Sequence, residues 1–147
     1  MLLNSLLEVR RRSEALIEPL EPEDLGLQGM ADASPPKWHL AHTTWFFETF
    51  LLKPYLQGHQ ACDQRWSVLF NSYYDSIGEQ HPRPERGMLT RPTIGEVLAW
   101  RQRVDQGLAA LLTTAESSVV NLVELGLHHE QQHQELLLMD LLDGFSR

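Results

Sequence analysis

Cysteine is nearly absent from this sequence, and so are long apolar runs and an excess of basic residues. Cys62 is the only cysteine among 147 residues, which excludes an internal disulfide and indicates a reducing, cytoplasmic setting. No apolar run approaches the roughly 20 residues that span a membrane. Twelve Lys and Arg against 20 Asp and Glu give a net charge of −8, which argues against nucleic acid or an anionic membrane as a partner.

The composition that remains is typical of a single folded domain, with 42% hydrophobic and 22% charged residues. Apolar residues recur at helical spacing in four segments, and no segment alternates as a strand does. We expect helices over about residues 2–20, 34–57, 93–112 and 117–142. These predict an all-α four-helix bundle with a long structured loop between helices two and three. Within that loop, a short helix is expected around residues 66–76.

The ends of these helices carry recognisable signals. Ser34 is predicted to cap the second helix, with Pro36 in its first turn. Thr93 and Glu96 form a capping box at the start of the third helix. Gly144 is a plausible stop for the fourth. In the first helix, the run Arg10–Arg12 is expected to face solvent.

Three histidines fall on the inward faces of two helices. Steps of three and four along the fourth helix connect His129 and His133 with Gly126, which leaves space one turn below them. The same steps along the second helix place His42 between Trp38 and Trp45. Neutral imidazole suits Zn, Cu, Fe and Ni, and bundle cores commonly hold metals on facing helices. A hydrogen-bonded polar core is the alternative, but two histidines one turn apart each need a buried partner.

The other histidines receive lesser roles. His39 shares a flank with His42 and is expected to be structural or to hydrogen-bond a ligand ring. His128 points about 100° away from His129. His59 and His81 lie in the loop and are expected to be solvated.

Residues 129–133 also match the zinc-protease pattern HExxH, in which the glutamate is a general base. We discount this interpretation because Met139 stands where a metzincin has its third histidine, and little sequence follows to supply another ligand. Glu130 is then expected to be either solvated or a hydrogen-bond partner of a ligand.

The loop segment 81–87 is stiffened by prolines and carries Arg83 and Arg86. Two arginines can clamp a small carboxylate through bidentate, charge-assisted bonds. Ordinary salt bridges to the many acidic residues explain the pair equally well, so the residues alone leave both possibilities open.

Three blocks together resemble the N-terminal region of the ergothioneine-biosynthesis sulfoxide synthases. They are residues 34–48, which read SPPKWHLAHTTWFFE, then LFNSYY at 69–74 with 81–87 and TRP at 90–92, and finally HHEQQHQE at 128–135. Their order and spacing also match that family, and they cover nearly the whole sequence.

The resemblance implies a DinB-like four-helix bundle with a non-haem iron(II) site of His42, His129 and His133. It implies a thiol substrate (cysteine or γ-glutamylcysteine), hercynine as the second substrate, and O2 driving C–S bond formation and sulfoxidation. Arg83 and Arg86 would bind carboxylates of the thiol substrate, and Gln132 would contact the other substrate.

Members of that family continue into a C-terminal domain resembling formylglycine-generating enzymes, which supplies a catalytic tyrosine and much of the substrate pocket. This sequence stops where the link to that domain would begin, so we expect one metal-binding domain over 1–147 that is incomplete for turnover by itself. One alternative is a stand-alone DinB-like thiol S-transferase using zinc or nickel. Another is a non-catalytic metal-binding or assembly module, for which exposed apolar surface makes a homodimer plausible.

Overall fold

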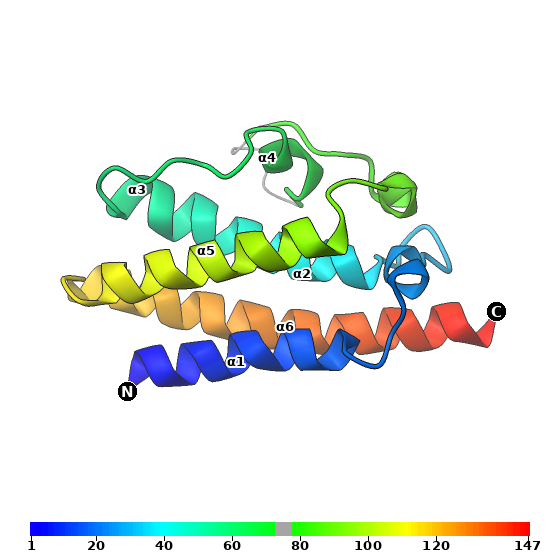
Figure 1. The fold of residues 1–147 in the computed structure, drawn as a ribbon, viewed down its shortest axis with the longest axis horizontal. Helices are drawn as coiled ribbons and strands as arrows, with labels where there is room; N and C mark the ends of the chain where they lie inside the picture. The colour runs from blue at the N-terminus through cyan, green and yellow to red at the C-terminus, as the bar shows by residue number, and fades with distance from the viewer. Residues whose placement is uncertain (73–77) are drawn as a thin grey trace.

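The described residues of the computed structural model, 1–72 and 78–147, fold into helices with no strand among them. The long helices are α1 (Leu2–Ile17), α2 (Pro36–Phe47), α5 (Ile94–Leu112) and α6 (Ser117–Ser146). Helix α2 packs against α5 and α6, and α1 packs against α6 and α5, so the four form one bundle (Figure 1). The predicted all-α four-helix bundle is confirmed.

The core lies where the apolar faces of these helices meet. Large side chains from every long helix are almost fully buried there, including Leu6, Trp45, Phe47, Trp100, Leu108, Val123 and Leu137. Burial of such faces, rather than intrinsic helix propensity, supplies most of the stability of helices in a bundle. The core therefore fixes which face of α2 and of α6 points inward, and both carry histidines there.

Helix α2 continues beyond Phe47 through a π-helical turn, η2 (Glu48–Leu52), into the short α3 (Lys53–Tyr55). The sequence predicted this span and a disturbance at Pro54, which lacks an N–H donor. The predicted cap at Ser34 is wrong. Pro35 occupies the N-cap position without a side-chain bond, and the Ser34 hydroxyl instead accepts a hydrogen bond from Arg86 at 2.9 Å.

The connection from α3 to α5 is ordered where it is described. Helix α4 (Trp66–Leu69) is shorter than the helix predicted over 66–76, of which residues 73–77 lie outside the described part. Trp66 and Phe70 anchor this stretch by packing on Trp100 of α5, with ring centroids 4.8 and 5.8 Å away. A 3₁₀ turn, η4 (Arg83–Met88), follows before α5. The described parts of this long loop thus lie over the bundle, as Figure 1 shows.

Helix ends follow the capping prediction in one case and depart from it in another. The Thr93 side chain accepts from the Glu96 N–H, and Glu96 bonds back, so the predicted capping box at α5 is confirmed. Gly144 does not stop α6, which continues to Ser146. That glycine packs against Leu27, beside the 3₁₀ turn η1 (Pro22–Gly26), and a Cβ there would meet a Leu27 methyl at 2.5 Å. In the described part of the chain, no helix has the length and apolarity needed to cross a bilayer.

Candidate metal centre

His42 of α2 meets His129 and His133 of α6 inside the bundle. The ring centroid of His42 lies 5.1 Å from that of His129 and 4.7 Å from that of His133. The two α6 rings, one turn apart, are 4.6 Å from each other. One nitrogen from each ring lies within 4.8 Å of the other two, so the three residues could hold a metal ion. The helical periodicity predicted this convergence.

His42 is held from both faces and from one edge. Its ring stacks on Trp38 at 4.5 Å and on Trp45 at 5.4 Å, as the sequence spacing suggested. Its Nδ1 lies 2.6 Å from the carbonyl oxygen of Phe70 and must be the donor, because a carbonyl only accepts. The Nε2 atom is therefore left with a lone pair for a ligand.

His133 is supported by other polar side chains. Its Nδ1 lies 2.9 Å from Nδ1 of His39, and Nε2 of His39 lies 2.8 Å from a carboxylate oxygen of Asp140. His39 and Asp140 are both buried. Of the two roles expected for His39, the structure shows the hydrogen bond to a candidate ligand ring, that of His133.

His129 has a different environment. Its ring stacks on Phe46, with centroids 4.3 Å apart and planes 28° from parallel. Its Nδ1 is buried and has no hydrogen-bond partner among the described atoms. A buried polar atom without a partner costs roughly 1–3 kcal/mol. Three imidazoles of which one keeps an orphaned nitrogen form a donor set that fits a transition metal.

Burial sets the protonation of all three rings. It is the largest cause that lowers the pKa of His42 well below its ordinary value, and the neighbouring His133 and His129 lower that pKa further. Burial lowers the pKa of His129 to about 4 and, together with His39 and His129, that of His133 to about 2. The rings are therefore neutral near pH 7, which is the form that binds metals.

A pocket of about 240 Å³ opens onto this centre. The predicted ligands and the predicted substrate-binding residues Arg83, Arg86 and Gln132 all line it. The full lining is Asp32, Ser34, Trp38, His39, His42, Ser72, Arg83, Arg86, His129, Gln132, His133, Leu136, Met139 and Asp140. The structure thus brings the loop arginines and Gln132 to the same cavity as the histidines, although the roles of those three residues remain predictions.

The two arginines reach the pocket in different ways. Arg83 donates from Nε and Nη2 to the backbone carbonyl of Asp32, at 3.2 and 2.5 Å. Arg86 is buried, donates to the hydroxyls of Ser34 and Ser72, and places its guanidinium 3.6 Å over the ring of Trp38. Because Trp38 also stacks on His42, Arg86 and a candidate ligand share one aromatic platform.

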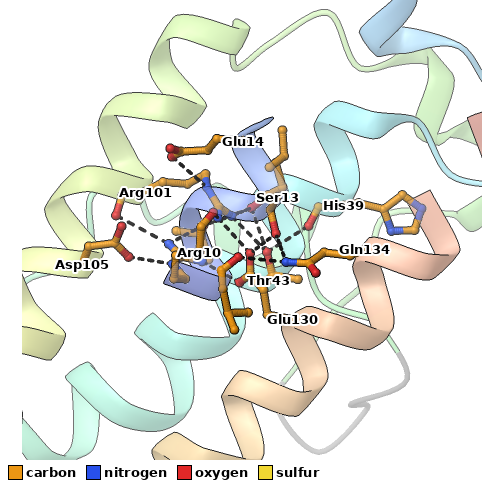
Figure 2. Close-up of polar contacts among 12 residues, drawn as sticks. Arg10, Ser13, Glu14, His39, Thr43, Arg101, Asp105, Glu130 and Gln134 are labelled. Carbon is orange, nitrogen blue, oxygen red and sulfur yellow. Dashed lines mark hydrogen bonds and ion pairs between the residues drawn. The ribbon is translucent and has the colours of Figure 1, made fainter. Parts of the chain in front are cut away.

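Glu130 belongs to a separate buried cluster, which Figure 2 shows. Its oxygens accept from Arg10 of α1 and Arg101 of α5, both at 2.8 Å, and from the Ser13 hydroxyl. Burial by itself raises the pKa of Glu130, but the charges of Arg101 and Arg10 outweigh it and hold the pKa at about 2. The carboxylate is fully buried and is not among the pocket-lining residues, so it is not placed as a protease general base.

That cluster was missed by the sequence analysis. Arg10 was expected in solvent with Arg11 and Arg12, yet it is 1% exposed and also pairs with Asp105 at 2.6 Å. Glu130 is neither solvated nor bonded to a ligand ring. Arg101 received no role, although it lies on the buried face of α5 with Val97 and Val104. The helical spacing of Arg101 from these two valines was the signal that could have predicted its burial.

The remaining histidines lie outside the centre. His128 is exposed, as predicted. His59 was expected in solvent, but its side chain is buried, at 7% exposed, and its Nε2 pairs with Glu48 at 3.0 Å. His81 is half-buried, with its Nε2 lying 3.1 Å from the carbonyl oxygen of Glu85.

The sequence matches the family model of the DinB superfamily over residues 5–137. That range covers all of α2 and α5 and most of α1 and α6. It also includes the three histidines and the loop that carries Arg83 and Arg86. A search of curated proteins gives no match.

Proposed function

This chain belongs to the DinB superfamily, and on that premise we propose that it is the metal-binding domain of an iron(II)- and O2-dependent sulfoxide synthase. The reaction joins cysteine or γ-glutamylcysteine to hercynine. A C–H bond of the hercynine imidazole and the S–H bond of the thiol break, and a C–S bond and an S–O bond form. Dioxygen is the four-electron oxidant and ends as the sulfoxide oxygen and one water.

The observation that supports this proposal is that the three candidate ligand imidazoles and two guanidinium groups line the same pocket. His42, His129 and His133 would hold iron(II), which supplies the redox chemistry when bound. Three protein ligands leave coordination positions open for substrates. Neutral imidazole ligands leave the ion's positive charge in place, which favours a thiolate over a thiol nearby.

The protein's own contribution is binding and orientation. Arg83 and Arg86 carry positive charge to the pocket, where they would hold carboxylates of an amino-acid thiol through charge-assisted bonds. Gln132 lies between the two α6 histidines on the same helix and lines the same cavity, and in this proposal its amide contacts hercynine. The Trp38 ring excludes water from one side of His42.

The first test is metal binding. Protein loaded with iron(II) without oxygen should hold one equivalent, and His42→Ala, His129→Ala and His133→Ala should each weaken binding strongly. His128→Ala is the matched control, because His128 is exposed on the same helix. Iron affinity that none of the three site variants changes would contradict the centre.

The second test is thiol binding. Cobalt(II) can replace iron as a probe, because a bound thiolate adds a charge-transfer band to its spectrum. Cysteine should produce this band, and Arg83→Ala should weaken cysteine binding by about tenfold or more, the loss expected for a charge-assisted contact. Arg91→Ala should have no effect, since Arg91 is exposed and does not line the pocket. Equal losses in both variants would argue against a carboxylate site at Arg83.

A thiol S-transferase using zinc or nickel is the second candidate. An all-imidazole donor set favours neither iron nor these metals, so the ligands alone do not separate the two functions. The metal bound after expression and a transferase assay without oxygen distinguish them. Transfer of a thiol to an electrophile without O2 would replace the first proposal.

A further inference from the structure

A row of hydrogen-bonded polar groups, formed by His39, Asp140 and the backbone of Ser34, adjoins His133. Nδ1 of His133 lies 2.9 Å from Nδ1 of His39, and Nε2 of His39 lies 2.8 Å from Oδ2 of Asp140. The same oxygen lies 2.9 Å from the backbone nitrogen of Ser34. His39 and Asp140 are 4% and 8% exposed, so bulk water does not compete for these bonds.

The first link of this row has only one possible direction. A backbone N–H can only donate, so Oδ2 of Asp140 accepts from Ser34. An ionised carboxylate has no proton to donate, so the same oxygen also accepts from Nε2 of His39, and the proton between them belongs to His39. Nε2–H of His39 therefore points to Asp140, and its Nδ1 faces His133.

The second link joins two ring nitrogens, so one of them must carry a proton. If His133 donates from Nδ1, then His39 is neutral, its Nδ1 accepts, and Nε2 of His133 keeps a lone pair. If His39 donates instead, it carries a proton on both nitrogens, and the proton of neutral His133 sits on Nε2. Only the first arrangement leaves His133 able to bind a metal through Nε2.

We propose that Ser34, Asp140 and His39 form a relay that fixes His133 as the Nδ1–H tautomer and so presents Nε2 to the metal. His39 is a positioning residue here, because it acts through His133. The carbonyl of Phe70 does the same for His42 by accepting its Nδ1 proton. The proposal rests on the metal centre described above and adds residues that determine which nitrogen His133 and His42 offer.

Ser34 also connects this relay to the pocket wall. Its hydroxyl accepts from Arg86, while its backbone N–H holds Asp140. The relay therefore orients the ligand ring from a segment that precedes α2 and that also positions a loop arginine. A metal ligand held by a histidine and a carboxylate loses about 10–100-fold in metal affinity when such support is removed.

The relay can be tested on the metal-free protein. Nitrogen-15 NMR of histidine side chains distinguishes the two neutral tautomers and the cation. We expect His133 and His42 as Nδ1–H tautomers and His39 as the Nε2–H tautomer near pH 7.5. A protonated His39, or His133 as the Nε2–H tautomer, would overturn the proposal. This result does not depend on whether the protein uses iron, zinc or nickel.

Variants of His39 test the consequence for metal binding, with Zn²⁺ as the probe against a competing chelator. His39→Leu fills the space but accepts no proton, and we expect Zn²⁺ affinity to fall about 10–100-fold. His39→Gln offers an amide oxygen to His133 and an amide N–H to Asp140, so it should recover most of the loss. His128→Leu should bind like wild type. Equal affinity of wild type and His39→Leu would overturn the relay.

Two further results are distinguishable. If circular dichroism shows that His39→Leu does not fold, His39→Gln and the wild-type NMR spectrum still decide. Wild-type-like Zn²⁺ affinity of His39→Gln together with the predicted tautomers supports the relay. Weak Zn²⁺ binding by His39→Gln together with the opposite tautomers rejects it. If wild-type protein binds neither Zn²⁺ nor iron(II), the metal centre fails, while the tautomer of His133 still reports on the relay itself.

Discussion

At the scale of single residues, Glu130 offers the clearest prediction. Its carboxylate neutralises part of the positive charge of Arg10 and Arg101, whose side chains are 1% and 0% exposed. Glu130→Gln keeps the shape but leaves Arg10 and Arg101 without that charge, and removing one partner of a buried ion pair costs about 3–5 kcal/mol. We expect a loss of that order in the free energy of unfolding, measured by urea denaturation.

The matched control is Glu124→Gln, which removes an exposed carboxylate from the same helix and should change stability by less than about 0.5 kcal/mol. If Glu130 were instead a catalytic base, its variant would fold with wild-type stability and lose only activity. Equal unfolding free energies for wild type and Glu130→Gln would thus contradict the structural role assigned here.

The candidate site was more predictable than this cluster for a physical reason. His42 stands on a helix face with Trp38 and Trp45, and His129 and His133 share theirs with Leu122 and Leu136, so periodicity alone placed the three histidines inward. Glu130 lies about 100° around α6 from His129, on a face that meets α1 and α5. The apolar pattern of α6 indicates one buried face and does not reveal that a second face is buried as well. In α1, the neighbouring Arg11 and Arg12 made Arg10 resemble a solvated residue.

At the scale of elements, the contact between α2 and α6 depends on a glycine. A Cβ at Gly126 would lie 2.4 Å from a carbon of the Phe47 ring, and that ring is fully buried. The space that the sequence analysis expected beside Gly126, one turn below the histidines, is therefore filled by the Phe47 ring. Gly126→Ala gains helix propensity of about 1 kcal/mol but forces this contact apart, and overpacking costs about 1–3 kcal/mol.

We therefore expect Gly126→Ala to lower the melting temperature, measured by circular dichroism. Gly95→Ala is the control, since Gly95 lies in the exposed first turn of α5 and an added Cβ meets nothing closer than 3.9 Å. That variant should be neutral or stabilised by up to about 1 kcal/mol. A stabilised Gly126→Ala would mean that α6 can move away from Phe47 without cost.

A metal would join α2 to α6, because its ligands come from both helices. Binding to the folded state alone stabilises it by about 2.7 kcal/mol when free metal exceeds the dissociation constant a hundredfold. Chelator should therefore lower the melting temperature of loaded wild-type protein. It should leave His133→Ala unchanged, because that variant lacks a ligand. A chelator effect of the same size in His133→Ala would place the stabilising metal elsewhere.

Element boundaries show what local sequence can and cannot specify. The start of α5 was predictable because Thr93 and Glu96 satisfy each other within one turn. Ser34 carries an equally good local signal, yet its hydroxyl bonds Arg86, more than 50 residues away. Gly144 likewise does not end its helix. The position is glycine because a Cβ there would meet the side chain of Leu27. Local signals were correct where no distant residue competed for the same atoms.

At the scale of the whole molecule, one surface remains uncovered. Leu138, Met139, Leu142 and Phe145, called the α6 row here, lie 48%, 59%, 74% and 55% exposed near the C-terminal end of α6. This is the red end of the helix in Figure 1. Their spacing puts them on one side of the helix, and apolar residues gathered in this way mark contact surfaces. Met139 also lines the metal pocket.

We propose that a second copy of the chain covers the α6 row. Exposed Glu135 precedes the row, and Arg147, which pairs with Asp143 of its own helix at 3.2 Å yet is 54% exposed at its side chain, follows it, so an antiparallel pair of α6 helices brings Glu135 of each copy near Arg147 of the other. Analytical ultracentrifugation should show dimers at micromolar concentration and monomers for Leu142→Glu. Leu125→Glu is the control, because Leu125 is 57% exposed on α6 but lies outside the row. Wild type that stays monomeric, or both variants dissociating alike, would contradict this interface; dimerisation would also place the partner at the pocket mouth beside Met139.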